Sequence, residues 1–371
     1  MKKITSILAA VMLVTFLAAC GGNASPEGKT PEGGAAPAES KVTVNFGLMP
    51  YYDYAPWALA KNQGFFEEEG IEFKSTMFAV EGNVAPALVN GSIDIGGFGD
   101  TPSVTLAAQF EDLRMVSFNN IFKGFAIMSR ADSDFKTYEE FLEELGDPKE
   151  AAIETGKQLQ GKSVVTTSGA TFYMVLEQAL SNAGLSIEDM NVIDMEPDMG
   201  VSAFISGTGD FYLGGLPQRA KLEEEGFETL IAGEEIGAGA VSLAGLAATK
   251  SFVDNNEETI RKIQNVWFKT MDYMTSNPNE AYQFIADWSN EQTGGSGTAE
   301  EAKQFIEQNV IFATTPEEMQ SLFYADDSEV NWKKRYDQLI EYHVEDGVIR
   351  EGSVDPNNLV IAETLFKQFN P

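Results

Sequence analysis

From Val42 onward, short apolar runs alternate with amphipathic segments along the chain. The apolar runs have the length and β-branched content of buried strands, and the segments between them carry apolar residues at helical spacing. Regular alternation of this kind is typical of α/β proteins, in which helices flank a doubly wound, mostly parallel sheet. In the first half of the chain the pattern predicts strands over residues 42–48, 71–78, 93–96, 115–118 and 125–129 and helices over 56–63, 84–89, 103–110 and 138–145.

A second series follows a charged segment, residues 146–160, which we interpret as a surface insertion. The pattern predicts two crossings between the series, near residues 119–124 and 237–245, which divide the folded body into lobe 1 (residues 42–122 and 245–371) and lobe 2 (residues 123–244). After residue 256 the pattern turns helical, with capping boxes at Thr298 and Thr315. The second series predicts strands over 162–166, 192–195, 211–213, 229–232 and 246–249 and helices over 171–183, 201–205 and 219–225.

The N-terminal segment reads as an export signal. Lys2 and Lys3 precede an apolar run that is too short for a spanning helix and has no basic stop after it. The run ends in Leu17-Ala18-Ala19-Cys20-Gly21, which resembles a bacterial lipobox. We therefore predict a lipoprotein signal peptide over residues 1–20, lipidation of Cys20, and a flexible tether over residues 21–41. This pattern places the protein outside the cytoplasm, attached to a membrane by its lipid.

Composition narrows the function classes. The 371 residues carry a formal net charge of −32 and are 43% apolar, which is enough for two domains with cores of their own. Such negative charge argues against nucleic acid or an anionic membrane surface as a partner. With only Cys20 and His343, the chain has no intrachain disulfide and almost no basis for Ser-His-Asp or Cys-His catalysis or a histidine-rich metal site. We expect a monomer with no catalytic residue, no metal and no cofactor.

Candidate ligand-binding side chains gather in loops that follow predicted strands. In open α/β sheets, such loops lie at the carboxyl ends of the strands, where ligands bind. The loop after the first strand combines aromatic rings, which offer flat apolar walls, with one carboxylate. Two later loops, near residues 97–102 and 167–171, begin helices whose free N–H groups face outward. The candidate ligand-binding residues are Tyr51, Tyr52, Asp53, Tyr54, Trp57, Glu81, Asn83, Gly99, Asp100, Thr101, Ser168, Gly169, Ala170, Thr171, Glu196, Gly215 and Pro217.

Two ligand chemistries compete in these loops. Helix starts favour an anion, whereas the carboxylates favour a cation or a ring that bears N–H groups. Neither these three loops nor the loop that holds Glu81 and Asn83 contains arginine or lysine. The nearest basic residues along the chain are Lys123 and Arg219. Because an aromatic pair contributes about 0.5–1.5 kcal/mol and a cation over a ring about 0.5–2 kcal/mol, the rings and carboxylates favour a planar or amine-bearing organic solute. A sulfonate, taurine or nitrate remains the alternative.

The order of short motifs resembles the type II periplasmic solute-binding proteins of ABC importers, within the group that binds sulfonates, taurine, nitrate or thiamine pyrimidines. The resemblance covers about residues 42–250. It rests on Pro56-Trp57-Ala58-Leu59-Ala60-Lys61-Asn62-Gln63-Gly64-Phe65-Phe66 with Gly70-Ile71, on Ala87-Leu88-Val89-Asn90-Gly91-Ser92-Ile93-Asp94-Ile95, on Leu159-Gln160-Gly161-Lys162-Ser163-Val164, and on Ala203-Phe204-Ile205-Ser206-Gly207-Thr208-Gly209-Asp210.

The resemblance implies two lobes that close on a small solute by hinge bending, each built on a doubly wound sheet, with further helices at the C-terminus. It implies delivery of the solute to a membrane permease with its ATPase, and a solute-facing role for the loop near 167–171. Two alternatives stay open: an enzyme of the thiamine-pyrimidine synthesis type, and a receptor subunit that reports the solute to a sensor. The first would need a cysteine-rich segment, which this sequence lacks.

Overall fold

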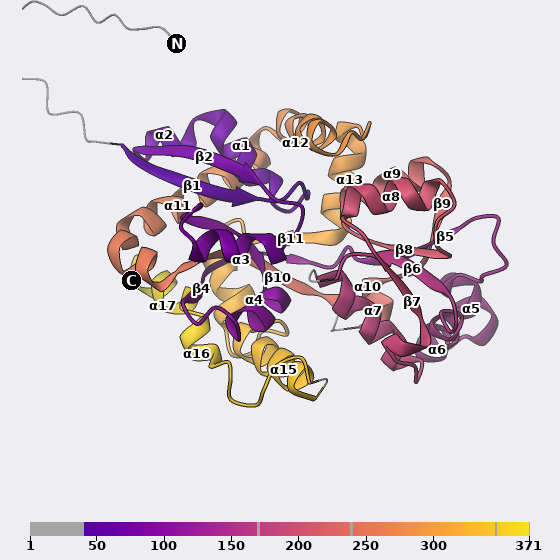
Figure 1. Ribbon diagram of the computed structural model, residues 1–371. Coiled ribbons are helices and arrows are strands. Elements are labelled where there is room, and N and C mark those ends of the chain that lie inside the picture. Colours follow the sequence, from indigo (N-terminus) through magenta and orange to yellow (C-terminus); the bar gives the residue numbers. More distant parts are fainter. Residues whose placement is uncertain (1–40, 169–170, 238–239, 346, 371) are drawn as a thin grey trace, which may run out of the picture. The chain divides into compact units, whose positions relative to one another are not determined.

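A computed structural model describes residues 41–168, 171–237, 240–345 and 347–370 (Figure 1). The predicted signal peptide with Cys20, the tether up to residue 40, and the candidate residues Gly169 and Ala170 lie outside the described residues. Among the described helices, none combines the length and the apolarity needed to cross a membrane.

The first sheet has six strands and is mixed. Every residue of β3, β4 and β10 is buried, as in sheets covered by helices on each side. β1 pairs in parallel with β2 and β3, whereas β10 runs antiparallel to β3 and β4, and β11 runs antiparallel to β4. In spatial order the strands are β11 (Val310–Phe312), β4 (Leu113–Phe122), β10 (Ser242–Thr249), β3 (Ile95–Gly99), β1 (Val42–Leu48) and β2 (Ile71–Met77).

The second sheet has five shorter strands and is also mixed. β6 is parallel to β7 and β8, and β5 is antiparallel to β8 and β9. The chain leaves the first sheet after β4, enters the second at β5, and returns after β9 along β10 (Figure 1). In spatial order these strands are β7 (Asn191–Asp194), β6 (Ser163–Thr166), β8 (Phe211–Leu213), β5 (Ala126–Arg130) and β9 (Phe227–Ala232).

Helices connect and cover the strands. Those of the first part are α1 (Ala55–Gln63), α2 (Phe65–Glu68), α3 (Glu81–Val89) and α4 (Asp100–Ala107). Between β5 and β10 come α5 (Tyr138–Leu145), α6 (Pro148–Lys157), α7 (Thr171–Asn182), the 3₁₀ turn η1 (Ile187–Asp189), α8 (Pro197–Ile205), α9 (Leu216–Glu224) and α10 (Gly233–Ile236). After β10 come α11 (Lys250–Ser276), α12 (Pro278–Thr293), α13 (Ala299–Asn309), α14 (Pro316–Met319), the π-helical η3 (Gln320–Tyr324), α15 (Trp332–Glu345), α16 (Pro356–Leu359) and α17 (Ala362–Phe369).

The predicted α/β class is confirmed, but the sheets are mixed rather than mostly parallel. The physical reason is the path of the chain. β4 carries the chain away from the first sheet and its neighbour β10 brings it back, so the two must run in opposite directions. The alternation of strand and helix predicts neighbours along the chain but carries no signal for a strand that returns from another sheet. The three-residue strand β11 was not predicted either.

The charged segment 146–160 is not a surface insertion, because most of it forms α6. Asp147 caps this helix by accepting hydrogen bonds from the backbone N–H groups of Lys149 and Glu150. Its inner face is made of small residues, and a Cβ on Gly156 would lie only 2.9 Å from the Cβ of Ala183. Because the buried face contains few large apolar residues, the charged residues dominated the hydropathy pattern and no helix was predicted from the sequence. The buried residues of α6 are Ala151, Ala152, Thr155 and Gly156.

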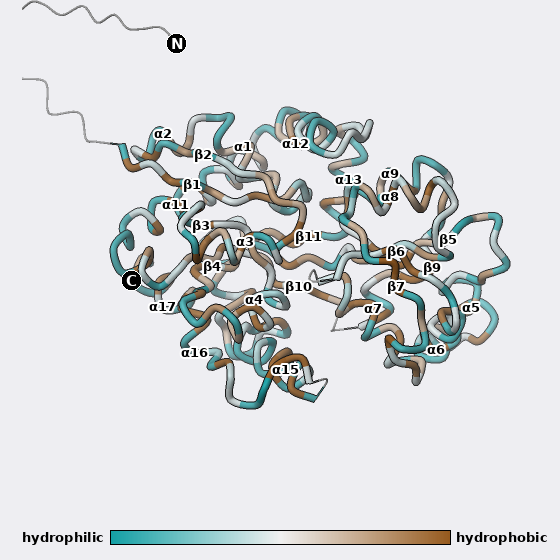
Figure 2. Tube along the Cα trace, viewed as in Figure 1, coloured by the Kyte–Doolittle hydropathy of each residue, from teal (hydrophilic) through white to brown (hydrophobic). Residues whose placement is uncertain are grey.

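Apolar residues fill the sheets and the inner faces of the helices, as the brown segments of the tube in Figure 2 show. Around β1, rings from distant segments interlock: the centroid of Trp57 lies 5.0 Å from that of Trp267 on α11 and 5.4 Å from that of Phe46. The Trp267 indole N–H donates to the carbonyl oxygen of Ala313 at 2.7 Å. This core holds β1 and α1 rigidly, and the loop between them carries the candidate site.

Candidate functional site

A small cavity lies where the β1–α1 loop meets the starts of α3, α7 and α9, the end of β4 and the start of β10. Its volume is about 30 Å³, which is room for about two water molecules. Segments associated with both sheets contribute to its wall. The lining residues are Tyr51, Asp53, Tyr54, Glu81, Phe122, Phe125, Thr171, Phe172, Gly215, Leu216, Ser242 and Ala244.

The β1–α1 loop is a tight turn that directs its side chains inward. The backbone N–H groups of Tyr54 and Ala55 both donate to the carbonyl oxygen of Tyr51, at 3.1 Å each. The Tyr51 hydroxyl donates to the carbonyl oxygen of Ala79 at 2.8 Å, which fixes its ring. Tyr54 packs so closely on β3 that a Cβ on Gly97 would lie 2.7 Å from its ring, so only glycine fits there. Two of the loop's rings therefore form a rigid wall.

A continuous series of rings crosses the cavity wall. Centroid distances are 4.6 Å from Phe122 to Phe125, 5.9 Å from Phe125 to Phe172, 6.2 Å from Phe172 to Tyr51, and 6.4 Å from Tyr51 to Tyr54. The first three pairs meet edge to face, an arrangement that aromatic quadrupoles favour. The series offers ring faces and edges to a flat solute and leaves little polar surface in the wall.

Two carboxyl groups interrupt this apolar wall. Asp53 is 5% exposed and Glu81 is 7% exposed, and among the described residues neither has a salt-bridge partner within 4 Å. Burial, with a smaller contribution from Glu81, raises the pKa of Asp53 to about 7. Burial also raises the pKa of Glu81 to about 7, and the nearby Asp100 adds to the shift. The cavity therefore holds two acids that ionise near neutral pH and favour a cation.

The basic side chains closest along the chain are engaged elsewhere. Lys123 pairs with Glu234, and Arg219 pairs with Glu223 at 2.9 Å while its guanidinium lies over the ring of Phe305. No lysine, arginine or histidine is among the described lining residues. An anion in this cavity would meet two carboxyl groups and no opposite charge.

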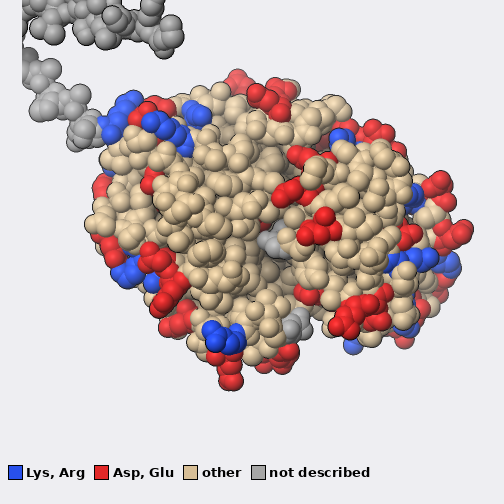
Figure 3. Space-filling model, viewed as in Figure 1, with Lys and Arg blue, Asp and Glu red and all other residues tan. Residues whose placement is uncertain are grey.

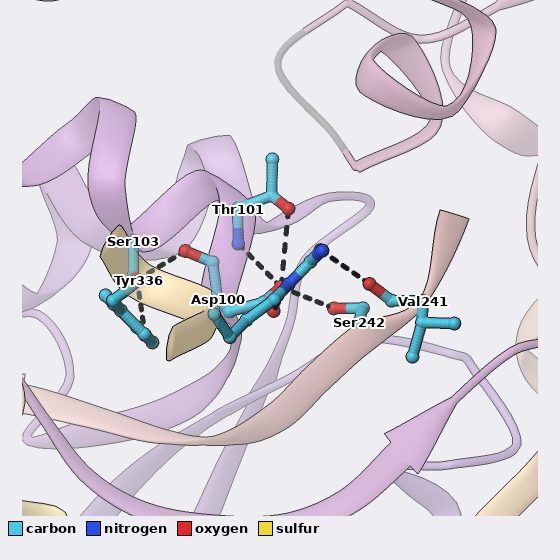
Figure 4. A network of polar contacts seen from close by, with 7 residues as sticks. Asp100, Thr101, Ser103, Val241, Ser242 and Tyr336 are labelled. Atoms are coloured by element: carbon cyan, nitrogen blue, oxygen red, sulfur yellow. Dashed lines mark hydrogen bonds and ion pairs between the residues drawn. The ribbon is translucent and has the colours of Figure 1, made fainter. Parts of the chain in front are cut away.

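Asp100 and Thr101 are not among the lining residues of the cavity, and both belong to a network of polar contacts (Figure 4). One carboxylate oxygen of Asp100 accepts from Arg335 Nε at 2.7 Å, and the other accepts from Ser242 Oγ at 2.9 Å. Arg335 also donates to the carbonyl oxygen of Val241 at 2.6 Å. Asp100 is fully buried and its charge is compensated. It thus supports Ser242, which does line the cavity, and Gly99 lies alongside, since a Cβ there would be 3.2 Å from Ser242 Oγ.

The remaining candidates are placed differently. Neither Trp57 nor Tyr52 lines the cavity. Trp57 packs in the core, and the Tyr52 hydroxyl lies beside Gly297, where a Cβ would be 3.3 Å away. Asn83 is exposed on α3, and the Ser168 N–H donates to Asp194 at 2.9 Å. Glu196 and Pro217 stand at the starts of α8 and α9, outside the wall. The structure thus brings together Tyr51, Asp53, Tyr54, Glu81, Thr171 and Gly215.

Half of the lining residues were not predicted. Phe122, Phe125, Ser242 and Ala244 lie at the two places where the chain passes between the sheets, and both crossings had been predicted from the sequence. Segments that cross between two sheets necessarily border the space between them, so this signal could have found these four. Phe172 and Leu216 follow the predicted residues Thr171 and Gly215 directly along the chain. Among the described residues, no group of three or more His, Cys, Asp or Glu could hold a metal ion.

Comparison with known proteins identifies the family. The model of the NMT1-like family matches residues 37–289, which is more than half of the chain. The chain belongs to the NMT1-like family. All of the lining residues of the cavity fall within the matched region, whereas α13 to α17 lie beyond it.

Individual relatives of this NMT1-like protein are distant. The curated "Putative binding protein" of Brucella abortus (strain 2308) is 25% identical over 252 residues, covering 66% of this chain and 71% of the relative. The alkanesulfonate-binding protein SsuA of Xanthomonas axonopodis pv. citri, solved with MOPS, has a TM-score of 0.66 and 16% identity, and the match covers 87% of this chain and 99% of SsuA.

The periplasmic nitrate-binding protein NrtA of Synechocystis PCC 6803 has a TM-score of 0.64 and 15% identity, and the match covers 89% of this chain and 88% of NrtA. These similarities show that the NMT1-like protein has the fold of the periplasmic binding proteins.

Proposed function

We propose that this protein is the extracytoplasmic solute-binding component of an ABC importer and that its solute is a small amine-bearing or cationic planar molecule. The fold and the family support solute capture. One observation supports the solute class: Asp53 and Glu81 are buried in a ring-lined cavity whose described lining residues include no lysine, arginine or histidine.

The cavity chemistry favours a cation over the anions bound by the structural relatives. An isolated carboxylate in an apolar site is costly unless a counter-charge joins it. A protonated amine would supply that charge, and its ring or methylene groups would contact Tyr51, Tyr54 and Phe172, where cation–π contacts contribute about 0.5–2 kcal/mol each. A sulfonate or nitrate would need a basic partner, and Lys123 and Arg219 are already paired.

We further propose that the two sheets are the cores of two lobes, residues 42–122 with 245–371 and residues 123–244. Solute would then bind between the lobes at the β1–α1 loop, and the lobes would close over it by bending at the two crossings. The protein would deliver the solute to a permease and its ATPase without altering it, as a monomer and without a cofactor.

Localisation follows from the N-terminal pattern. We propose that residues 1–20 are removed, that Cys20 carries the lipid, and that residues 21–41 tether the folded body outside the cytoplasm. The acidic surface in Figure 3 agrees with this arrangement, since it would be repelled by anionic lipid and would keep the folded body free of the membrane surface.

The test is a binding panel on protein freed of solute by unfolding and refolding. Isothermal titration with benzylamine, phenethylamine, taurine, methanesulfonate and nitrate should give one site for an aromatic amine and none for the anions. A micromolar site corresponds to about −8 kcal/mol. Mass spectrometry of the solute that co-purifies with untreated protein should show a nitrogen base.

Matched variants locate the site. Glu81→Gln and Asp53→Asn should each weaken amine binding by about tenfold or more, because a buried counter-charge is removed. Glu363→Gln removes a carboxylate that pairs with Lys333 and Lys367 and does not line the cavity, and this variant should bind amines normally. Tight binding of a sulfonate or nitrate, with no response to any amine, would refute the proposed solute class.

A further inference from the structure

One polar side chain beside the cavity has an unused acceptor. Gln218, in the first turn of α9, is 2% exposed. Its amide nitrogen donates to a carboxylate oxygen of Asp198 at 2.9 Å. Its Oε1 has no hydrogen-bond partner among the described residues. Because a carboxylate only accepts hydrogen bonds, Asp198 fixes which end of the amide faces it and leaves the oxygen facing the other way.

That oxygen lies next to the cavity wall. A Cβ on Gly215 would be 3.0 Å from Gln218 Oε1 and 3.3 Å from the ring of Tyr51, and both Gly215 and Tyr51 line the cavity. Gly215 has φ −80° and ψ 175°, an ordinary extended conformation, so its lack of a side chain is not needed for backbone geometry. The bare face of Gly215 leaves open the space between the carboxamide oxygen and the solute.

We infer that Gln218 is a specificity-determining residue that accepts a hydrogen bond from a second donor group on the solute. This inference rests on the proposed function and extends it. Asp53 and Glu81 take the cationic end from one side, and Gln218 takes an N–H or O–H group from the side of α9. The solute class is therefore a cationic ring compound with a second hydrogen-bond donor, such as an aminomethyl ring that carries an amino or hydroxyl substituent.

The strength of this selection follows from the unpaired oxygen. A buried acceptor that stays unsatisfied destabilises the complex, and a solute with the second donor removes that cost. A solute without the second donor leaves the Gln218 oxygen unsatisfied, so the cost remains. Sites built to hydrogen-bond a substrate group reject the analogue that lacks it far better than apolar pockets do.

The experiment uses matched pairs of amines on the full refolded chain. The pairs are benzylamine with 4-aminobenzylamine and with 3- and 4-hydroxybenzylamine, and phenethylamine with tyramine, measured by isothermal titration. In the wild-type protein at least one donor-bearing member should bind about tenfold more tightly than its plain partner. Gln218→Met, which keeps the length and removes the acceptor, should reduce that ratio to about one.

Two further variants complete the design. Gly215→Ala should also reduce the ratio, because its methyl group covers Oε1 without straining the backbone. Gln264→Met, at a buried glutamine on α11 that contacts Met319, should keep the wild-type ratio. Circular dichroism and thermal melts confirm that each variant folds.

The outcomes separate the two proposals. If plain amines bind and Glu81→Gln weakens their binding by about tenfold or more, but no pair differs in the wild type or Gln218→Met leaves the ratios unchanged, the role of Gln218 is refuted and the proposed function stands. If no amine binds the wild type, both are refuted.

Discussion

At the scale of single residues, the unusual feature is the pair of acids in the cavity wall. Burial raises the pKa of Asp53 from 3.8 and that of Glu81 from 4.5, each to about 7. The folded solute-free protein therefore binds more protons than the unfolded chain between about pH 4 and pH 8. The stability that the protonated Asp53 and Glu81 contribute to the folded protein is fully present below their ordinary pKa values. It is lost as pH rises through 7. A protonated amine would compensate the charges that form there.

Solute affinity and stability should thus change with pH in opposite directions. From pH 5.5 to pH 8, affinity for an alkyl amine such as phenethylamine, which stays protonated as lysine does, should rise by about tenfold or more. Over the same range the free energy of unfolding of the solute-free protein should fall. Titration calorimetry and urea unfolding at each pH measure the two quantities.

Glu81→Gln provides the decisive comparison. It should weaken amine binding at pH 8 and, at the same pH, raise the free energy of unfolding of the solute-free protein, because an unpaired buried charge is removed. Glu363→Gln should leave the pH dependence of binding unchanged. An affinity that is flat with pH in the wild type would contradict the assignment of these acids to the site.

At the scale of elements, a buried polar network ties α4, α15 and β10 together (Figure 4). Arg335 on α15 binds the Asp100 carboxylate at the start of α4 and the carbonyl oxygen of Val241 just before β10. Ser103 Oγ and the Tyr336 hydroxyl are 2.8 Å apart and reinforce the same contact. The network secures the return crossing to the first sheet, so the last helices support a site that they do not line.

Arg335→Met should be strongly destabilising. It leaves Asp100 fully buried without its counter-charge, which typically costs about 3–5 kcal/mol. The double variant Arg335→Met with Asp100→Asn should recover part of that loss. Urea unfolding measures both.

A matched arginine serves as the control. Arg261 pairs with Glu258 on the exposed face of α11, and Arg261→Met should change the free energy of unfolding by less than about 1 kcal/mol. Equal losses for the two arginine variants would show that the buried network contributes no more than a surface pair.

At the scale of the whole described fold, segments flanking the two sheets touch on both sides of the cavity. The Tyr342 hydroxyl on α15 donates to Glu177 on α7 at 2.9 Å. On the other side, Ser296 Oγ donates to Glu224 on α9 at 3.1 Å, and Tyr51 meets Phe172 within the cavity. A space of about 30 Å³ is too small for an aromatic amine, since benzene occupies an engineered cavity of about 150 Å³. We infer a closed conformation that must open to admit solute.

Small-angle X-ray scattering should detect that opening. The solute-free protein should have a larger radius of gyration than the closed structure, and phenethylamine should reduce it. Tyr342→Phe removes one hydrogen bond of the closed form and should weaken phenethylamine binding by about fivefold, corresponding to about 1 kcal/mol.

Tyr273→Phe is the corresponding control. It removes a similar tyrosine–glutamate hydrogen bond, to Glu280, between α11 and α12, and it should leave affinity unchanged. A radius of gyration that does not respond to solute, with Tyr342→Phe binding normally, would argue against lobe closure.

Much of this structure could be predicted from local sequence. The pattern of apolar positions located β1 and β8 to the residue and most other elements within a few residues, because strand and helix periodicity depend on neighbours along the chain. The same local signals placed Tyr51, Asp53, Tyr54, Glu81, Thr171 and Gly215 after strands, where the cavity lies. The net charge of −32 likewise follows from the sequence without the fold.

Long-range contacts supplied the rest. Within one loop, Tyr51 and Tyr54 face the cavity whereas Trp57 joins the core, because Trp267 and Phe46 pack against it. In the sequence, Asp100 and Asp53 were equally good candidates for solute binding. In the fold, Arg335 neutralises Asp100, whereas no described residue neutralises Asp53. Strand direction in the mixed sheets depended on the path of the chain between them. The partners that decide these choices include Trp267 for Trp57 and Arg335 for Asp100, each far away along the chain, and periodicity in the sequence contains no record of such partners.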